Sequence, residues 1–207
     1  MKTYQLYING QYVDPVNGEW FDTIDPYRGE AWAKIPRGTA ADADKAVKAA
    51  NEAMWNGPWA KMTASARGKA MRKLGDLVAA NAERLAEIEV RDNGKLMAEM
   101  LGQLRYHPEW WWYFGGLVDK LEGGLVPIDK AETFAYTTHE PVGVVAALTA
   151  WNSPLLFVAW KCAAALAAGA PAHAASDGVA LQSDVMLQKT VEENGRSRTV
   201  LTEPKAV

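Results

Sequence analysis

Apolar and polar residues alternate through residues 1–35, and this two-residue period is typical of β-strands. Residues 4–8 and 11–13 flank Asn9-Gly10, a pair that favours a tight hairpin turn. Residues 20–24 form a further short strand between turns that contain Gly18 and Gly29. The N-terminal segment therefore predicts a small group of paired strands.

A spacing of three and four residues between apolar positions replaces this alternation after Thr39 and predicts a run of helices. The expected helices begin near Thr39, at Thr63 or Ser65, at Asn81 and near Leu96. Expected stops or breaks lie at Gly57-Pro58, at Asp92-Asn93-Gly94 and before Pro108. The second helix is expected to bury one face, made of Ala70, Met71, Leu74, Leu77 and Val78.

The character of the chain changes after residue 121. Residues 133–138 alternate as a short strand, and residues 142–148 are a nearly continuous apolar run, typical of a strand buried on both faces. A helix over 154–168 follows, with Ser153 as its N-cap. Strand, turn and helix make a βα unit, which predicts an α/β fold with a parallel sheet. No further strand is predicted after Gly169.

Composition narrows the class of protein. Hydrophobic residues make up 49% and charged residues 23%, which is ordinary for a soluble globular chain. The net charge of −3 argues against nucleic acid or an anionic membrane as the partner. The single cysteine, Cys162, excludes an internal disulfide and fits a reducing compartment. With no apolar leader and no apolar run of membrane-spanning length, we expect a cytoplasmic location.

The turn over residues 149–154 is the strongest candidate for chemistry. It joins the C-terminal end of the predicted buried strand to the N-terminus of the predicted helix, where ligands bind in open α/β sheets. The side-chain amide of Asn152 could donate there to developing negative charge. The alternative is that Asn152 caps the helix beside Ser153, because asparagine is a favoured cap.

Several motifs in order carry a resemblance to one family. Residues 140–156 read Glu-Pro-Val-Gly-Val-Val-Ala-Ala-Leu-Thr-Ala-Trp-Asn-Ser-Pro-Leu-Leu, and Ala159-Trp-Lys follows. Upstream lie Tyr7-Ile-Asn-Gly10 and Asp92-Asn-Gly-Lys95. Residues 4–169 resemble the N-terminal portion of the NAD(P)-dependent aldehyde dehydrogenase superfamily. The resemblance implies an incomplete form of that fold, in which hairpins and helices lead into the first βα unit of a parallel, Rossmann-like dinucleotide-binding sheet.

The same resemblance implies site residues. In the family a cysteine thiolate attacks an aldehyde, an asparagine amide and a backbone N–H hold the oxyanion, hydride passes to NAD or NADP, and a glutamate-activated water releases the acid. Asn152 matches the oxyanion donor. The cofactor-lining segment is matched by Leu148, Thr149, Ala150 and Trp151, where Ala150 replaces the usual proline. A strand near 133–139 matches an oligomerisation strand, which implies a homo-oligomer.

The chain departs from the family after Gly169. The Lys-Pro-Ser/Ala-Glu motif that holds the adenosine ribose is absent, and Lys205 does not fit it. The family's catalytic cysteine and glutamate have no counterpart. We therefore expect two regions, residues 1–169 and a divergent, disordered tail over 170–207. The change after Gly169 resembles a truncation, a disrupted reading frame or a C-terminal replacement. The expected function is an inactive aldehyde dehydrogenase polypeptide or, alternatively, a non-catalytic subunit that associates with intact homologues.

Three other features of the sequence could be functional, and each has a simpler structural interpretation. Cys162 lies in an alanine-rich helix and is expected to be a core residue rather than a nucleophile. His107, His139 and His173 show no metal-ligand spacing, so no metal site is predicted. The aromatic run over 110–114 would point around a helix, which favours packing over an aromatic binding module.

Overall fold

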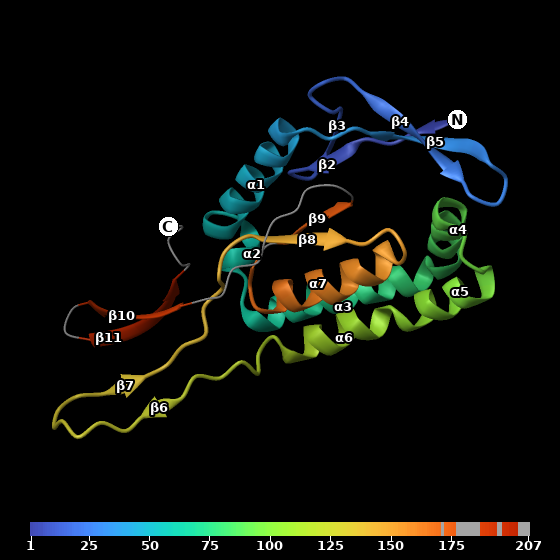
Figure 1. Cartoon of the computed structure of the whole chain (residues 1–207). Coiled ribbons are helices and arrows are strands. Elements are labelled where there is room, and N and C mark those ends of the chain that lie inside the picture. Colours follow the sequence, from blue (N-terminus) through green and yellow to red (C-terminus); the bar gives the residue numbers. More distant parts are fainter. Residues whose placement is uncertain (171, 177–186, 194–195, 203–207) are drawn as a thin grey trace.

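The structure is a computed structural model of the 207-residue chain. It describes residues 1–170, 172–176, 187–193 and 196–202, with side chains described over 1–170. The N-terminal strands lie beside a layer of helices, and a long two-stranded arm extends away from both (Figure 1). Within the described residues, no helix combines the length and the apolar character needed to cross a membrane.

The N-terminal strands form a hairpin and a three-stranded sheet. The predicted hairpin is confirmed: β2 (Leu6–Ile8) pairs antiparallel with β3 (Gln11–Val13). Asn9 and Gly10 both have positive φ, 53° and 76°, as a tight turn that follows the strand twist requires. The sheet has the order β1-β5-β4, from β1 (Lys2–Thr3), β5 (Glu30–Pro36) and β4 (Trp20–Asp25).

The predicted helices are also present, with local caps and stops. The helical bounds are α1 Ala40–Trp55, α2 Pro58–Lys61, α3 Ala64–Ala80, α4 Ala82–Asn93, α5 Met97–Tyr106 and α6 Pro108–Leu117. Thr39 and Asp42 form a capping box at α1, and Thr63 caps α3. Gly94 ends α4 at φ 78°, a conformation that favours glycine. The expected break before Pro108 falls at His107, between α5 and α6.

The buried face of α3 differs from the predicted one. Leu77 is 53% exposed and Leu74 37%, whereas Gly68, Met71 and Gly75 are buried. The reason is close packing against α6: a Cβ on Gly75 would lie 2.7 Å from Nε1 of Trp112, so only glycine admits the indole. Small residues rather than large apolar ones therefore mark the contact face.

The βα unit follows the arm. β6 (Leu125–Val126) pairs antiparallel with β7 (Ala135–Tyr136), which is shorter than the predicted strand over 133–138. Next come β8 (Val145–Thr149) and α7 (Pro154–Ala167). Burial of β8 on both faces is not observed, because Ala146 is exposed between Val145 and the buried Ala147. The helix supports β8 on one face: Ala147 packs in one core with Ala159, Cys162, Ala163, Trp111 and Met71.

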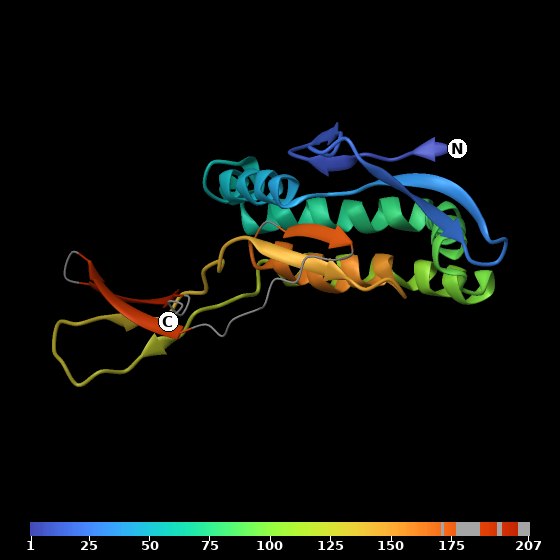
Figure 2. The same ribbon diagram turned by 45° about the horizontal axis from the view of Figure 1, so that its top comes forward.

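Strands follow Gly169 where none was predicted. β9 (Ala172–Ser176) pairs parallel with β8, which confirms the parallel sheet expected from the βα unit. β10 (Leu187–Glu193) and β11 (Arg196–Thr202) form an antiparallel hairpin that includes Thr199 to Leu201, and both views place it near the β6–β7 arm (Figure 2). Residues 177–186 and Lys205 lie outside the described residues, so the division at 169 stays a prediction.

Candidate active site

The turn between β8 and α7 presents its central residues at the C-terminal edge of two parallel strands. β8 and β9 pair from Val145 with Ala172 to Thr149 with Ser176, so both strands end at the same edge. The N–H of Ser153 donates to the carbonyl of Ala150 at 3.3 Å and closes the turn. This edge is where ligands bind in parallel α/β sheets.

Asn152 and Trp151 are exposed at this edge. The side chain of Asn152 makes no hydrogen bond to any residue that the structure describes, whereas its backbone carbonyl accepts from Nδ2 of Asn93 at 3.5 Å. Trp151 is 71% exposed. Ser153 occupies the N-cap position of α7, as predicted, but its side chain makes no cap hydrogen bond, and no capping bond is observed for Asn152. The amide of Asn152 is thus free to meet a ligand.

A buried polar cluster lies directly behind the turn. Nζ of Lys95 donates to Oγ of Ser153 at 2.5 Å and to Oε1 of Gln103 at 3.2 Å, and it pairs with Oε1 of Glu89 at 3.6 Å. Nδ2 of Asn93 reaches the same carboxylate oxygen at 3.4 Å. The segment that ends α4 and begins α5 therefore fixes the turn through side chains.

Burial shifts the pKa of two groups beside the turn. Burial raises the pKa of the Glu89 carboxyl, while the Lys95 ammonium and the N–H of Leu155 oppose that shift in part. Burial also lowers the pKa of His107, whose Nε2 lies 2.8 Å from the carbonyl of Leu155. Nδ1 of His107 is buried without a partner among the described residues, which favours the neutral ring.

The residues that sequence reasoning assigned to a dinucleotide lie along this edge in different environments. The carbonyl of Leu148 accepts a hydrogen bond from Nζ of Lys161. Thr149 is buried, whereas Ala150 and Trp151 are exposed. The neighbouring strand β9 is Ala-His-Ala-Ala-Ser, so it carries no lysine or glutamate for ribose hydroxyls. The fit to a dinucleotide is therefore partial: the strand edge at the turn is exposed, but β9 offers no lysine or glutamate as a ribose contact.

Cys162 is a core residue, as predicted. It is 6% exposed within the cluster that contains Trp111 and Ala159. Burial raises the pKa of its thiol, and Lys161 only partly opposes this shift. A buried thiol with a raised pKa is a poor nucleophile, because the thiolate is the reactive form.

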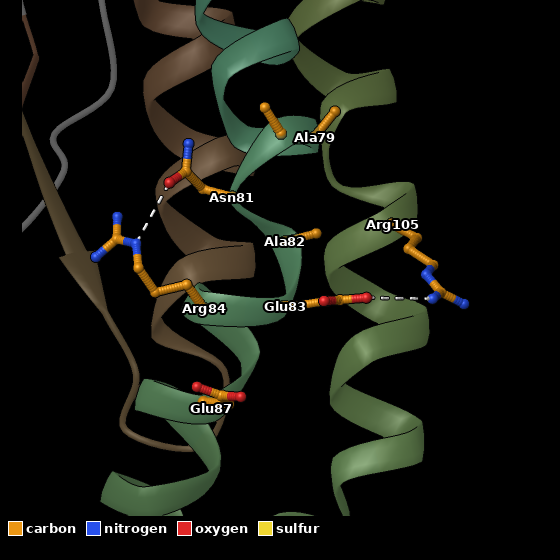
Figure 3. Close-up of a pocket in the computed structure, with 8 residues that line it drawn as sticks. Ala79, Asn81, Ala82, Glu83, Arg84, Glu87 and Arg105 are labelled. Atoms are coloured by element: carbon orange, nitrogen blue, oxygen red, sulfur yellow. Dashed lines mark hydrogen bonds and ion pairs between the residues drawn. The ribbon is translucent and has the colours of Figure 1, made fainter.

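Two hollows lie away from the turn. One, at the junction of α3 and α4, is lined by charged side chains, and an ion pair between Arg105 and Glu83 at 4.0 Å crosses it (Figure 3). The other lies between the β4–β5 turn and the end of α4, beside Asp25 and Arg91. Over the residues that the structure describes, no group of histidine, cysteine, aspartate or glutamate could hold a metal ion.

Sequence reasoning missed the residues behind the turn. Glu89, Asn93 and Lys95 lie about sixty positions from Ser153, and only the pairing of α4 and α5 with α7 brings them together. The Asp92-Asn-Gly-Lys95 motif was part of the resemblance, yet the motif alone assigns no contact. The available signal was an acidic residue, Glu89, that stands between Ile88 and Val90 shortly before that motif.

Comparisons with known proteins agree with this geometry. The model of the "Aldehyde dehydrogenase family" matches residues 12–202. The chain is 46% identical over 169 residues to (Z)-2-((N-methylformamido)methylene)-5-hydroxybutyrolactone dehydrogenase of Acinetobacter baylyi, covering 82% of this chain and 34% of that protein. It is 42% identical over 170 residues to human mitochondrial 10-formyltetrahydrofolate dehydrogenase, covering 80% of this chain and 18% of that protein.

Solved structures show the same relation. A mutant betaine aldehyde dehydrogenase of Staphylococcus aureus in complex with NAD+ superposes with a TM-score of 0.80 at 36% identity, covering 83% of this chain and 34% of that one. The NAD+ complex of an aldehyde dehydrogenase from Bacillus cereus superposes with a TM-score of 0.79 at 36% identity. The match covers 84% of this chain and 35% of that one. The chain thus spans about a third of the length of these solved relatives. With the family model matched over most of its length, the chain belongs to the aldehyde dehydrogenase family.

Proposed function

We propose that this chain supplies the oxyanion donor of an aldehyde dehydrogenase site, through the side-chain amide of Asn152. The observation that carries the proposal is an exposed amide at the C-terminal edge of two parallel strands, without a hydrogen-bond partner among the residues that the structure describes. A neutral N–H donor aimed at a developing oxyanion lowers the barrier by about 3 to 4 kcal/mol. The turn is held from behind, so little reorganisation is needed when charge develops.

The proposed step begins when a thiolate attacks the aldehyde carbonyl and the carbonyl oxygen becomes negative. Asn152 donates its N–H to that oxygen. The only cysteine of this sequence is the buried Cys162, so the 207 residues offer the donor without a reactive thiolate. Exposed Ala150 and Trp151, with Leu148 and Thr149 beneath them, would line the nicotinamide cofactor NAD or NADP, which accepts hydride when bound. We expect the chain by itself to leave an aldehyde and NAD+ unchanged.

A chimera tests the role of Asn152. Residues 4–169 of this chain would replace the matching segment of the Acinetobacter baylyi relative, which is 46% identical. Asn152→Ala should then lower kcat by about a hundredfold to a thousandfold, because an oxyanion donor is lost. Asn51→Ala, at an exposed position on α1, is the matched control and should leave kcat unchanged. Equal kcat values for the Asn152→Ala chimera and its parent would refute the proposal.

A second candidate function is a non-catalytic subunit that joins a homologous chain. The β6–β7 arm, which extends from the body, favours it, because Leu125 on β6 is 72% exposed and Phe134, directly before β7, is 68% exposed. Exposed apolar side chains on a projecting hairpin are typical of an interface. The particle size of the purified chain, measured alone and with a full-length homologue, tests this function. A monomer in both cases would contradict it.

The cytoplasmic location expected from the sequence belongs to the same proposal. It is supported by the single cysteine of the sequence, since secreted chains more often carry cysteines paired in disulfides. Detection of the chain in fractionated cells would test it.

A further inference from the structure

The hydroxyl of Ser153 is not used as its position in the chain would suggest. At an N-cap, a serine hydroxyl usually accepts a hydrogen bond from the N–H of the second or third helical residue. Ser153 is the N-cap residue of α7, and its side chain makes no such bond. The residue is nevertheless buried, at 7% exposure. A buried hydroxyl requires a partner, so the partner must come from outside α7.

That partner is Lys95, which lies between α4 and α5. Nζ of Lys95 donates to Oγ of Ser153 at 2.5 Å, and an ammonium can only donate, so the hydroxyl is the acceptor. The same ammonium donates to Oε1 of Gln103 at 3.2 Å and lies 3.6 Å from Oε1 of Glu89. A hydrogen bond from a charged donor is stronger than one between neutral groups. Ser153 is therefore bound to a cation that other groups hold in place.

The backbone around Ser153 is fixed as well. Its N–H donates to the carbonyl of Ala150 at 3.3 Å and closes the turn. The carbonyl of the preceding residue, Asn152, accepts from Nδ2 of Asn93 at 3.5 Å. Oδ1 of the same Asn93 accepts from the N–H of Lys95 at 3.1 Å. Two side chains from the junction of α4 and α5 therefore hold two successive residues of the turn.

We propose that Ser153 is a positioning residue, whose hydroxyl is held by Lys95 so that Asn152 keeps its amide at the strand edge. This inference rests on the proposed function of Asn152. An oxyanion donor is effective when it is oriented before charge develops, and a displacement of about 1 Å can lower a rate about a hundredfold. The Asn152 side chain branches from the backbone one residue before Ser153, so a movement of Ser153 turns the amide with it.

A simpler role for Ser153 would be structural. In that case the hydroxyl stabilises the start of α7 and has no influence on the Asn152 amide. The substitution Ser153→Ala separates the two roles, because it removes the hydroxyl but leaves the pair between Lys95 and Glu89 intact. A structural role predicts lower stability with unchanged turnover per folded molecule, whereas a positioning role predicts slower turnover.

Kinetics of the chimera described above distinguish these roles. Ser153→Ala should lower kcat about tenfold and change KM by less than about twofold, because a misdirected donor weakens transition-state stabilisation without removing a substrate contact. In the Asn152→Ala background the same substitution should have no further effect on kcat, because no amide remains to be misdirected. Ser65→Ala, at an exposed position on α3, is the matched control and should leave both constants unchanged.

Failure of the Asn152 role and failure of the Ser153 role give different results. Equal kcat values for Asn152→Ala and its parent refute the role of Asn152, and the positioning role with it. A lower kcat for Asn152→Ala overturns the positioning role alone in two cases. In the first, Ser153→Ala leaves kcat unchanged, and in the second, it lowers kcat equally in both backgrounds.

Hydrogen exchange in the full-length chain tests the hold on the turn without any turnover. The N–H of residue 153 closes the turn onto Ala150. In the Ser153→Ala chain the protection factor of this N–H should fall about tenfold, because the turn opens more readily without the hydroxyl. Ser65→Ala should leave it unchanged. Equal protection in Ser153→Ala and the parent chain would show that Lys95 does not hold the turn through the hydroxyl, and would overturn the proposal whatever the role of Asn152.

Discussion

The β8–α7 turn and the β6–β7 arm both depart from the usual burial of apolar residues and exposure of charged ones. The turn buries charged side chains, whereas the arm exposes apolar ones. Behind the turn, the charged Glu89 and Lys95 are buried or nearly so, at 2% and 18% side-chain exposure. On the arm, the apolar Leu125 and Phe134 are 72% and 68% exposed. Buried charges hold one backbone geometry when they are paired, whereas exposed apolar residues gain stability only from a partner. The turn is therefore held by internal contacts, whereas the arm leaves apolar side chains exposed.

The largest expected effect comes from removing the cation behind the turn. Lys95→Met leaves the Glu89 carboxylate buried without its counter-ion, while its Oε2 already has no partner among the described residues. We expect a loss of about 3 kcal/mol in the free energy of unfolding, measured in urea. Lys48→Met removes an exposed pair with Asp44 and should cost no more than about 0.5 kcal/mol. Equal costs would show that the cluster behind the turn is not a rigid support.

The next effect is a pH dependence at His107. Its pKa is lowered by burial from 6.5, so the folded chain binds a proton less readily than the unfolded chain. The stability that the neutral ring contributes is present above pH 6.5 and is lost as the pH falls below that value through the lowered pKa. Wild-type chain should lose stability relative to His107→Gln in that range, as measured by urea unfolding at several pH values. Parallel stability curves would mean that His107 is protonated as easily in the folded state.

A smaller effect on stability is expected on the arm. Phe134→Ser removes an exposed ring that contacts only its neighbour Tyr136 among the aromatic pairs of the described residues. The free energy of unfolding of the isolated chain should change by less than about 0.5 kcal/mol. Association with a homologous chain, measured by light scattering, should weaken. A large loss of stability with unchanged association would reverse the comparison between arm and turn.

The smallest effect is expected at Asn152, the residue of the turn that is proposed to act on the oxyanion. Asn152→Ala removes an amide that bonds to nothing in the described part of the chain. Its effect on the free energy of unfolding should stay below about 0.5 kcal/mol, in contrast with Lys95→Met behind it. A cost above about 1 kcal/mol would indicate that Asn152 acts as a cap after all.

Local signals in the sequence predicted the local parts of the fold. Asn9-Gly10 specifies its hairpin, Thr39 its capping box and Gly94 its helix end, because each acts on residues within a few positions. β9 was missed because Ala172–Ser176 contains no β-branched or aromatic residue, and its strand form comes from pairing with β8. The exposed position of Asn152 follows from the pattern, but the contacts of Asn93 and Lys95 with the turn depend on packing of distant segments.

The central claim is that the turn is fixed without the Asn152 amide, which stays free to donate. Solution NMR of the labelled chain tests it through the side-chain amide protons of Asn152 and their exchange with water. We predict exchange as fast as in an unprotected asparagine. Slow exchange of the Asn152 amide would show that it is engaged within the protein, and that result would contradict the account.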